Sequence, residues 1–150
     1  MKSSNYYMLA KTMFGFEEIL AKELVTLGAQ NVKILNRAVS FKGDKGFMYK
    51  ANLNLRTALR ILKPIKHFQA YNEKDLYKNI YSIEWNKILR LENTFITSAT
   101  TKSEDFQHSK YASLIMKDAI ADKFRKKYNS RPNVDTKNPD ISIHLQISKN

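Results

Sequence analysis

The sequence contains no cysteine, which excludes disulfide bonds, thiol catalysis and zinc sites with cysteine ligands. Its four glycines stand too far apart to form a glycine-rich nucleotide loop, so no ATPase or methyltransferase signature is present. No apolar run approaches the ~18 residues of a membrane span, and the N-terminus has no apolar run followed by a small-residue cleavage site. These absences predict a cytoplasmic protein with no membrane segment.

Acidic residues are scarce as well. The 150 residues include 26 Lys and Arg but only 14 Asp and Glu, which gives a net charge of +12. This excess favours a polyanionic partner, with nucleic acid ahead of an acidic membrane surface. The basic excess is larger over residues 1–70, with 12 basic and 4 acidic residues, than over 71–150, with 14 and 10.

Groups for catalysis or metal binding are sparse. The histidines His67, His108 and His144 lie far apart in the sequence and predict no metal site. Asp118 and Asp122 are one helical turn apart and could act as an acid–base pair or hold a divalent cation. An exposed ion pair of Asp122 with Lys126, four residues later, is the favoured alternative. We therefore predict no catalytic, cofactor-binding or metal-binding residue in this chain.

The first seventy residues alternate short apolar strands with amphipathic helices. Gly28 is placed to end the first helix, and Pro64 indicates an edge position or a bulge in the last strand. The predicted elements are a strand at 5–11, a helix at 15–27, strands at 31–35 and 38–42, a helix at 45–55 and a strand at 58–69. The order β-α-β-β-α-β predicts an α+β, ferredoxin-like domain over residues 1–70.

A second α/β unit is predicted for residues 71–150. Its final strand alternates apolar and polar residues with period two, and a strand at the very end of the chain indicates a fragment of a larger sheet. The longest helix has Ser109 as its expected N-cap. The predicted elements are helices at 73–80 and within 82–91, a strand at 94–100, a helix at 109–128, a loop at 129–140 and a strand at 141–149.

Basic residues gather on the helix at 109–128. Lys110, Lys117 and Arg125 project within about 80° of one another, on the side opposite the apolar stripe, and further bases follow towards Arg131. A phosphate-binding surface is one interpretation; the alternative is a solvated face that complements the helix dipole. Four aromatic residues could stack on the nucleobases of a nucleic acid, although core packing is favoured for each of them. They are Tyr77, Trp85, Phe95 and Phe106.

Six segments in order resemble the bacterial large-subunit ribosomal RNA guanine-N2 methyltransferases that contain a THUMP domain. Each segment is weak alone, and together they span nearly the whole chain. They are FGFEEILAKELVTLGAQNV (14–32), VSFKGD (39–44), YKANLNLRTALRIL (49–62), DLYKNIYSIEW (75–85), TFITSAT (94–100) and SKYASLIMKDAIADKFRKKYNSRPNVD (109–135), the last followed by NPDISIHL (138–145).

The resemblance implies a domain order. In that family a ferredoxin-like piece leads into THUMP, an RNA-binding module, and a Rossmann-type catalytic domain with S-adenosylmethionine as cofactor follows. Residues 71–150 would then be a truncated THUMP domain, with the catalytic domain absent. The sequence has no Pro-Pro pair, so the family's Pro-Pro-Tyr motif and its cofactor residues match no position here.

The resemblance also suggests which residues contact RNA. Asp118 is expected to be structural, and Arg131 is the favoured contact because its guanidinium suits bidentate phosphate binding. For Arg56 and Arg60, together with Asn52, the alternative is a polar network between the two units. The full set of predicted RNA-binding residues is Arg131, Lys117, Lys110, Arg125, Lys126, Lys127, Arg56 and Arg60.

The favoured function is the RNA-binding N-terminal part of a ribosomal RNA methyltransferase, which holds structured RNA, large-subunit rRNA above all, for the absent domain. S-adenosylmethionine is expected only in that domain. Three alternatives stay open. They are a THUMP module of a tRNA methyltransferase or thiouridine synthetase, a ribosome-docking domain, and an enzyme that acts through Asp118 and Asp122.

Overall fold

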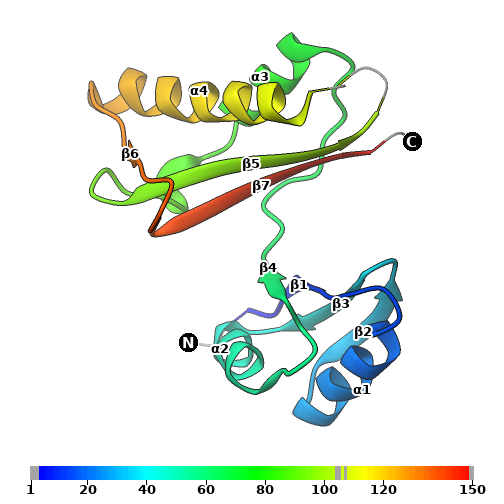
Figure 1. Cartoon of the computed structure of the whole chain (residues 1–150). Coiled ribbons are helices and arrows are strands. Elements are labelled where there is room, and N and C mark those ends of the chain that lie inside the picture. The colour runs from blue at the N-terminus through cyan, green and yellow to red at the C-terminus, as the bar shows by residue number, and fades with distance from the viewer. Residues whose placement is uncertain (1–3, 104–105, 107, 149–150) are drawn as a thin grey trace. The chain divides into compact units, whose positions relative to one another are not determined.

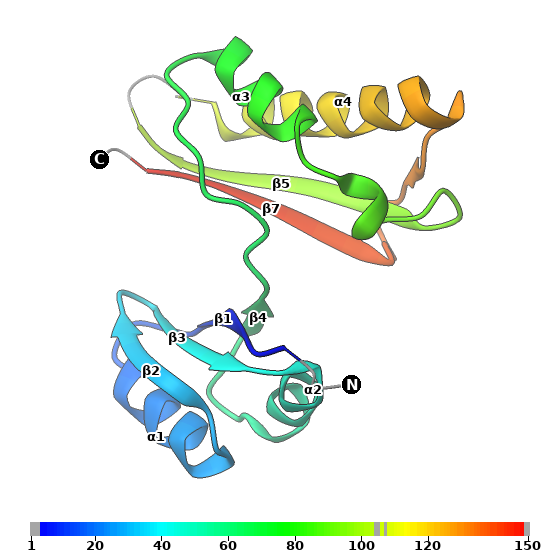
Figure 2. The same cartoon turned by 180° about the vertical axis from the view of Figure 1, so that it is seen from behind.

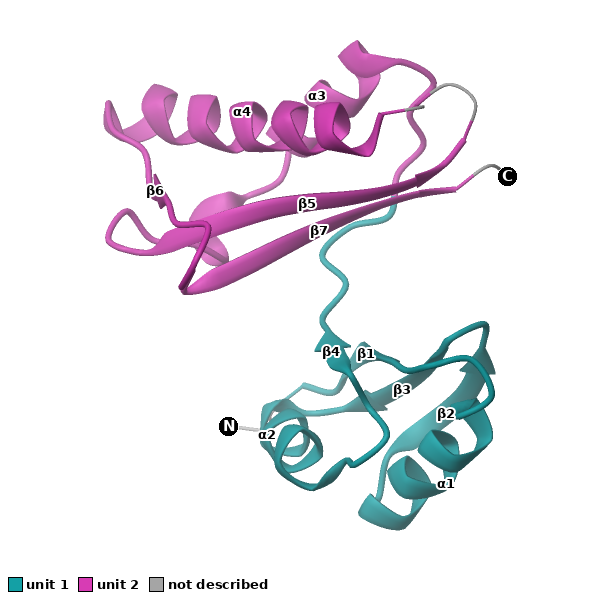
Figure 3. Ribbon diagram, in the orientation of Figure 1, with its two compact units in different colours: residues 1–67 teal, residues 68–150 magenta. Residues whose placement is uncertain are grey.

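Two hydrophobic cores with no residue in common divide the chain. The computed structural model describes residues 4–103, 106 and 108–148. It separates into unit 1, residues 1–67, and unit 2, residues 68–150 (Figure 3). The boundary expected from the sequence was residue 70.

Unit 1 has the predicted β-α-β-β-α-β order. Its four strands form one antiparallel sheet in the order β2-β3-β1-β4. Both helices lie on the same side of that sheet (Figures 1 and 2), which confirms the ferredoxin-like fold. The elements are β1 (Tyr6–Lys11), α1 (Glu17–Leu27), β2 (Gln30–Leu35), β3 (Ala38–Gly43), α2 (Lys45–Asn54) and β4 (Arg60–Leu62).

Local sequence explains the helix ends of unit 1. Gly28 ends α1 in the left-handed region with φ 101°, where a side chain would be strained. Asp44 caps α2 by accepting a hydrogen bond of 2.7 Å from the backbone N–H of Phe47. The sequence predicted both helices closely, at 15–27 and 45–55; Gly28 was the expected end of α1, whereas Asp44 was not selected as a cap although its signal is equally local.

The last strand of unit 1 is shorter than predicted. The expected strand at 58–69 is reduced to β4, Arg60–Leu62, which pairs with Leu9–Lys11 of β1. Pro64 lies beyond the strand, not within it as predicted. Proline has no backbone N–H to donate to a neighbouring strand, and from residue 63 the chain follows an irregular path out of the sheet.

Unit 2 packs two helices on one side of a parallel sheet with the strand order β6-β5-β7 (Figures 1 and 2). Trp85, Phe95 and Phe106 are buried, which confirms the preference for core packing at these positions. The indole N–H of Trp85 donates to the carbonyl of Ile80 over 2.8 Å. The elements are α3 (Glu73–Tyr81), the 3-10 turn η1 (Trp85–Lys87), β5 (Thr94–Lys102), α4 (Ser109–Tyr128), β6 (Asn133–Val134) and β7 (Ile141–Ser148).

Two details of unit 2 differ from the prediction. The N-cap of α4 is His108, with no side-chain capping bond, and Ser109 is already helical. The predicted loop at 129–140 contains the two-residue strand β6, which pairs with Thr94 and Phe95. A strand of two residues carries no period-two pattern for sequence reasoning to detect. Within the described ranges, no helix is both long and apolar enough to cross a membrane.

Candidate nucleic-acid interface

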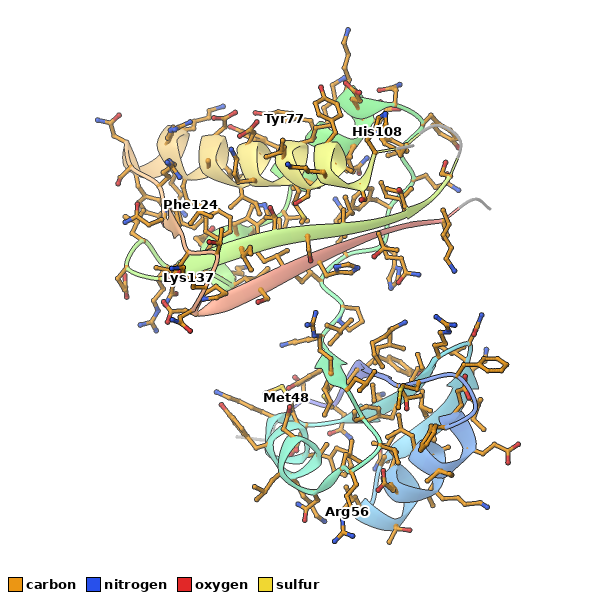
Figure 4. The ribbon with its side chains drawn as sticks, in the orientation of Figure 1. Met48, Arg56, Tyr77, His108, Phe124 and Lys137 are labelled. Atoms are coloured by element: carbon orange, nitrogen blue, oxygen red, sulfur yellow. The ribbon has the colours of Figure 1, made fainter. Side chains whose placement is uncertain are left out.

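The helix α4 carries most of the predicted RNA-binding residues, and its position is fixed by its apolar side. Ala119, Ile120 and Phe124 are each at most 2% exposed. In Figure 4, Phe124 lies on the side of α4 that faces the sheet. The polar side chains of this helix are therefore held on a rigid element, not on a loop.

Asp122 joins α3 to α4 and does not form the pair predicted for it. The hydroxyl of Tyr77 donates to Asp122 Oδ2 over 2.8 Å, and Arg125 Nη1 lies 3.2 Å from Asp122 Oδ1. Burial, followed by the hydrogen bond to Asp122, raises the pKa of Tyr77 to about 12. Among the described ion pairs, Asp122 has Arg125 as its partner and not the predicted Lys126. We conclude that Asp122 serves as a structural anchor.

Lys117 and Arg125 are not part of a purely solvated face. Lys117 Nζ lies 2.9 Å from Asp118 Oδ1, and the Lys117 side chain is 34% exposed. Ala121 lies on the same helix ridge, between Lys117 and Arg125, and is only 4% exposed. The sequence had placed these bases opposite the apolar residues, and it overlooked this buried alanine. Both bases are already paired with carboxylates.

The C-terminal end of α4 presents free positive charge. Asn129 ends the helix in the left-handed region with φ 52°, and its N–H donates to the carbonyl of Arg125 over 2.9 Å. Arg131 follows, exposed, next to the buried Pro132. Lys126 and Arg131 are exposed and form no ion pair within the described part of the chain. We name Lys126, Lys127 and Arg131 the basic end of α4.

Lys110 lies at the opposite end of this helix, in the first turn of α4. It is exposed, and none of the ion pairs in the described ranges includes it. The twenty residues of α4 span about 30 Å at ~1.5 Å per residue. Lys110 is therefore too far from the basic end of α4 to share one phosphate with it.

The two predicted residues of unit 1 lie on different parts of that unit. Arg56 lies in the loop after α2, on the side of the two helices (Figure 4). Its backbone N–H donates to Glu23 Oε1 over 3.3 Å. Arg60 lies on β4, beside Lys11 of β1. The side chain of Asn52 donates to the carbonyl of Met48 within α2, so the described partners of Asn52 and Arg56 lie within unit 1.

The sequence analysis did not select three further exposed or half-exposed lysines. Lys11, Lys33 and Lys42 lie on strands β1, β2 and β3, on the sheet face opposite the core residues Met8 and Val39. The signal was present, because alternate residues of a strand point to opposite faces. These lysines stand singly on three strands, whereas the bases of α4 form a continuous run in the sequence, Arg125 to Lys127.

Nothing in the described ranges forms a metal site, since no three or more His, Asp or Glu side chains are grouped to hold an ion. Asp118 and Asp122, which the sequence offered as an acid–base pair, are each ion-paired with a base of α4. The exposed cations of the described residues can bind anions.

These features define a class, namely an α+β protein in which a ferredoxin-like unit precedes a basic α/β unit. The RlmL ferredoxin-like domain matches residues 7–62, and the THUMP domain matches residues 70–150. The chain belongs to the THUMP family, and its first unit is of the RlmL ferredoxin-like type.

Relatives agree with this assignment. The ribosomal RNA large subunit methyltransferase K/L of Buchnera aphidicola subsp. Schizaphis graminum is 40% identical over 96% of this chain, which spans 21% of that protein. Among solved structures, SMU.472, determined as a complex with SAH, has a TM-score of 0.82 and 26% identity, covering 98% of this chain and 39% of its own.

A predicted N6-adenine-specific DNA methylase from Listeria monocytogenes has the same TM-score of 0.82 at 23% identity. The match covers 96% of this chain and 38% of the Listeria protein, and at this identity it supports the fold alone. The chain thus spans about a fifth of the length of the Buchnera methyltransferase and less than half of the length of the Listeria protein and of SMU.472.

Proposed function

We propose that this chain is the RNA-binding N-terminal part of a SAM-dependent ribosomal RNA (guanine-N2) methyltransferase. In this role it holds structured RNA, chiefly large-subunit rRNA, for a catalytic domain outside these 150 residues. The observation that carries the proposal is the 40% identity, over 96% of the chain, with a large-subunit rRNA methyltransferase. Such a protein would work in the cytoplasm, where its RNA is found.

The charge distribution supports an RNA partner. The net charge of +12 favours association with a polyanion, and the basic end of α4 offers exposed basic side chains at and just beyond the end of a rigid helix. Phosphate contacts of this kind fix the position of RNA without reading its sequence. They suit a module that presents a shaped RNA to another domain.

The cofactor belongs to a part of the protein that this chain does not include. The sequence contains neither a glycine-rich loop nor a Pro-Pro pair, so no residue here fits the binding of S-adenosylmethionine. We therefore assign no step of methyl transfer to these residues. Their contribution is to bind and orient the RNA.

The test measures binding of the whole chain to large-subunit rRNA fragments and to duplex DNA of equal length, from about 50 to 200 mM salt. We expect tighter binding to the structured RNA. The double variant Lys126→Ala/Arg131→Ala should lower the slope of log affinity against log salt by about 1.4–1.8, which corresponds to two lost phosphate contacts.

A matched control is available in the same unit. Lys87 and Arg90 are ion-paired with Glu84 and Glu92, so Lys87→Ala/Arg90→Ala removes the same residue types from sites already neutralised. This control should leave the slope nearly unchanged. Equal affinity for RNA and duplex DNA would contradict the proposed function, and equal losses in the two double variants would show that the RNA surface lies elsewhere.

A further inference from the structure

The sheet of unit 1 has one face packed on the helices and one face without a helix. Met8, Ala10, Val39 and Phe41 point to the packed face and are buried with α1. Because side chains alternate along a strand, their neighbours point to the other face. We name the charged and aromatic members of that other face the basic face of unit 1: Tyr7, Lys11, Lys33, Lys42 and Arg60.

The strand register places these residues close together. Tyr7 is opposite Lys42, and Lys11 is opposite both Ala38 and Arg60. Lys33 is opposite Ser40, which is opposite Leu9. Neighbouring strands are about 4.8 Å apart, and residues two apart on one strand are separated by about 6.7 Å. The basic face therefore combines four cations and one aromatic ring within the dimensions of a few nucleotides.

The acids of unit 1 are kept away from this face. Glu17, Glu18 and Glu23 lie on α1, and Asp44 caps α2. Glu17 accepts hydrogen bonds from the N–H groups of Gly15 (2.7 Å) and Arg37 (3.0 Å). Across the described residues, no carboxylate lies within ion-pair distance of the four cations of the basic face. Within the described ranges, no ion pair compensates their charge.

Tyr7 is the aromatic centre of the basic face. It lies on β1, an inner strand of the sheet, yet it is 53% exposed. Lys42 Nζ lies 5.7 Å from the centroid of its ring, and its hydroxyl accepts a long hydrogen bond of 3.4 Å from Asn31. An exposed tyrosine on an inner strand contributes little to the core. Its ring is available for stacking on a flat ligand.

We propose that the basic face of unit 1 binds an unpaired segment of the RNA, with one base stacked on Tyr7 and its phosphates on Lys11, Lys33, Lys42 and Arg60. This inference rests on the proposed function, because it takes RNA as the ligand, and it adds which part of the RNA unit 1 holds. Bases inside an A-form duplex are stacked on each other, and only unpaired bases can stack on a protein side chain. The exposed ring therefore favours a single-stranded segment over a duplex.

The experiment uses the whole chain and an unpaired RNA of about eight nucleotides that contains 2-aminopurine, whose fluorescence falls when it stacks. Tyr7→Ala should weaken binding of this probe about five- to a hundredfold and abolish the fluorescence change. Tyr7→Phe keeps the ring and should restore both. Tyr49→Ala is the matched control, because Tyr49 is 62% exposed on α2 of the same unit, and it should leave binding unchanged.

A charge variant tests the cations separately. Lys33→Gln/Lys42→Gln should lower the salt slope for the unpaired probe by about 1.4, at ~0.7 per single-strand phosphate contact. The control Lys22→Gln/Lys45→Gln changes two exposed lysines on the helices of the same unit. This control should leave the slope unchanged. Equal slopes in these two double variants would overturn the role of the cations.

The outcomes separate this inference from the proposed function. Salt-sensitive binding of rRNA fragments, together with probe binding that Tyr7→Ala leaves intact, overturns the inference and leaves the proposed function standing. Failure to bind either RNA overturns both. If Tyr7→Ala lowers the stability of unit 1 but leaves probe binding unchanged, Tyr7 stabilises the sheet of unit 1 and does not bind RNA, and the inference is again wrong.

Discussion

The two units differ in where they carry their charge. In unit 1 four bases without an ion-pair partner among the described residues share one sheet face, the basic face. In unit 2 the described part of the corresponding sheet face has a single exposed base, Lys102 at the end of β5, and the largest group of bases lies on α4. We name the exposed uncharged residues of that face the neutral face: Ser98, Thr100, Ser142, His144, Gln146 and Ser148. Both units pack two helices on one side of a sheet. Their different charge distributions therefore come from which residues occupy the outward positions of each strand and helix, and not from the arrangement of the layers.

Three residues of the neutral face are joined by hydrogen bonds. Ser98 Oγ lies 2.8 Å from His144 Nδ1, and Thr100 Oγ1 lies 3.2 Å from His144 Nε2. One ring thus bridges two hydroxyls of the neighbouring strand. The basic face of unit 1 has no such network among its cations, because lysine and arginine can only donate. His144 thus bonds within its own sheet, whereas the cations of the basic face can bond only to an acceptor that another group supplies.

The two hydrophobic cores also differ, in their content of aromatic residues. Unit 2 is built on large rings, including Trp85, Phe95 and Phe124, whereas the core of unit 1 is mainly aliphatic around Phe41. Phe95 is fully buried. We expect Phe95→Ala to lower the free energy of unfolding of unit 2 by about 3–5 kcal/mol. Fluorescence of Trp85, the only tryptophan, reports this transition in a denaturant titration.

The same variant tests whether the two units are independent. Because the cores share no residue, amide exchange in β1 and β3 should be unchanged in Phe95→Ala. Phe41→Ala, at a position that is also fully buried, should give the reverse pattern. If both variants destabilised both units equally, the chain would unfold as a single body and the comparison of separate units would fail.

Much of the fold was predictable because its signals are local. Gly28, with its left-handed φ of 101°, and Asp44, with its capping bond to Phe47, mark helix ends that a sequence shows directly. The predicted length of the strand at 58–69 was wrong for a non-local reason, because the length of β4 depends on how many residues of β1 can pair with it. Strand β6 was not predicted for a similar reason, because it is defined only by its pairing with Thr94 and Phe95.

The candidate site was predictable only in part. Exposed bases such as Arg131 can be found from charge and loop position. The engagement of Lys117 with Asp118 and of Arg125 with Asp122 depends on side-chain geometry that the spacing of residues does not decide. The three-residue spacing of Asp122 and Arg125 competed with the four-residue spacing to Lys126, and both are geometrically allowed on a helix.

A smaller effect is expected from the carboxylate that fixes a loop of unit 1. Glu23 accepts hydrogen bonds from the N–H of Thr57 (3.2 Å), the hydroxyl of Thr57 (2.6 Å) and the N–H of Arg56 (3.3 Å). We expect Glu23→Gln to destabilise unit 1 by about 1–2 kcal/mol. Amide exchange in β1 and β3 measures this loss, and the Trp85 transition of unit 2 should not move.

The pH dependence gives an independent check on Glu23. Burial alone would raise its pKa, but the hydrogen bonds from Thr57 and Arg56 hold the pKa below its ordinary 4.5. A folded pKa below the unfolded value stabilises the protein above pH 4.5, and this contribution is lost as the pH falls through the folded pKa. The loss of unit 1 stability below that pH should therefore be shallower in Glu23→Gln. Identical acid profiles would rule out this role for Glu23.

The smallest effect is expected on the neutral face of unit 2. A lysine added there tests whether any additional positive charge on a sheet face improves RNA binding. Gln146 is exposed and lies opposite Thr100. We expect Gln146→Lys to leave the salt slope for the unpaired RNA probe unchanged, because the probe should bind the basic face of unit 1, and the described strands of unit 2 carry no Phe, Tyr or Trp on the face of position 146 on which a nucleobase could stack. A slope steeper by about 0.7 would mean that the new lysine meets a phosphate. RNA would then pass over both sheet faces, and the contrast between the two units would be one of charge alone.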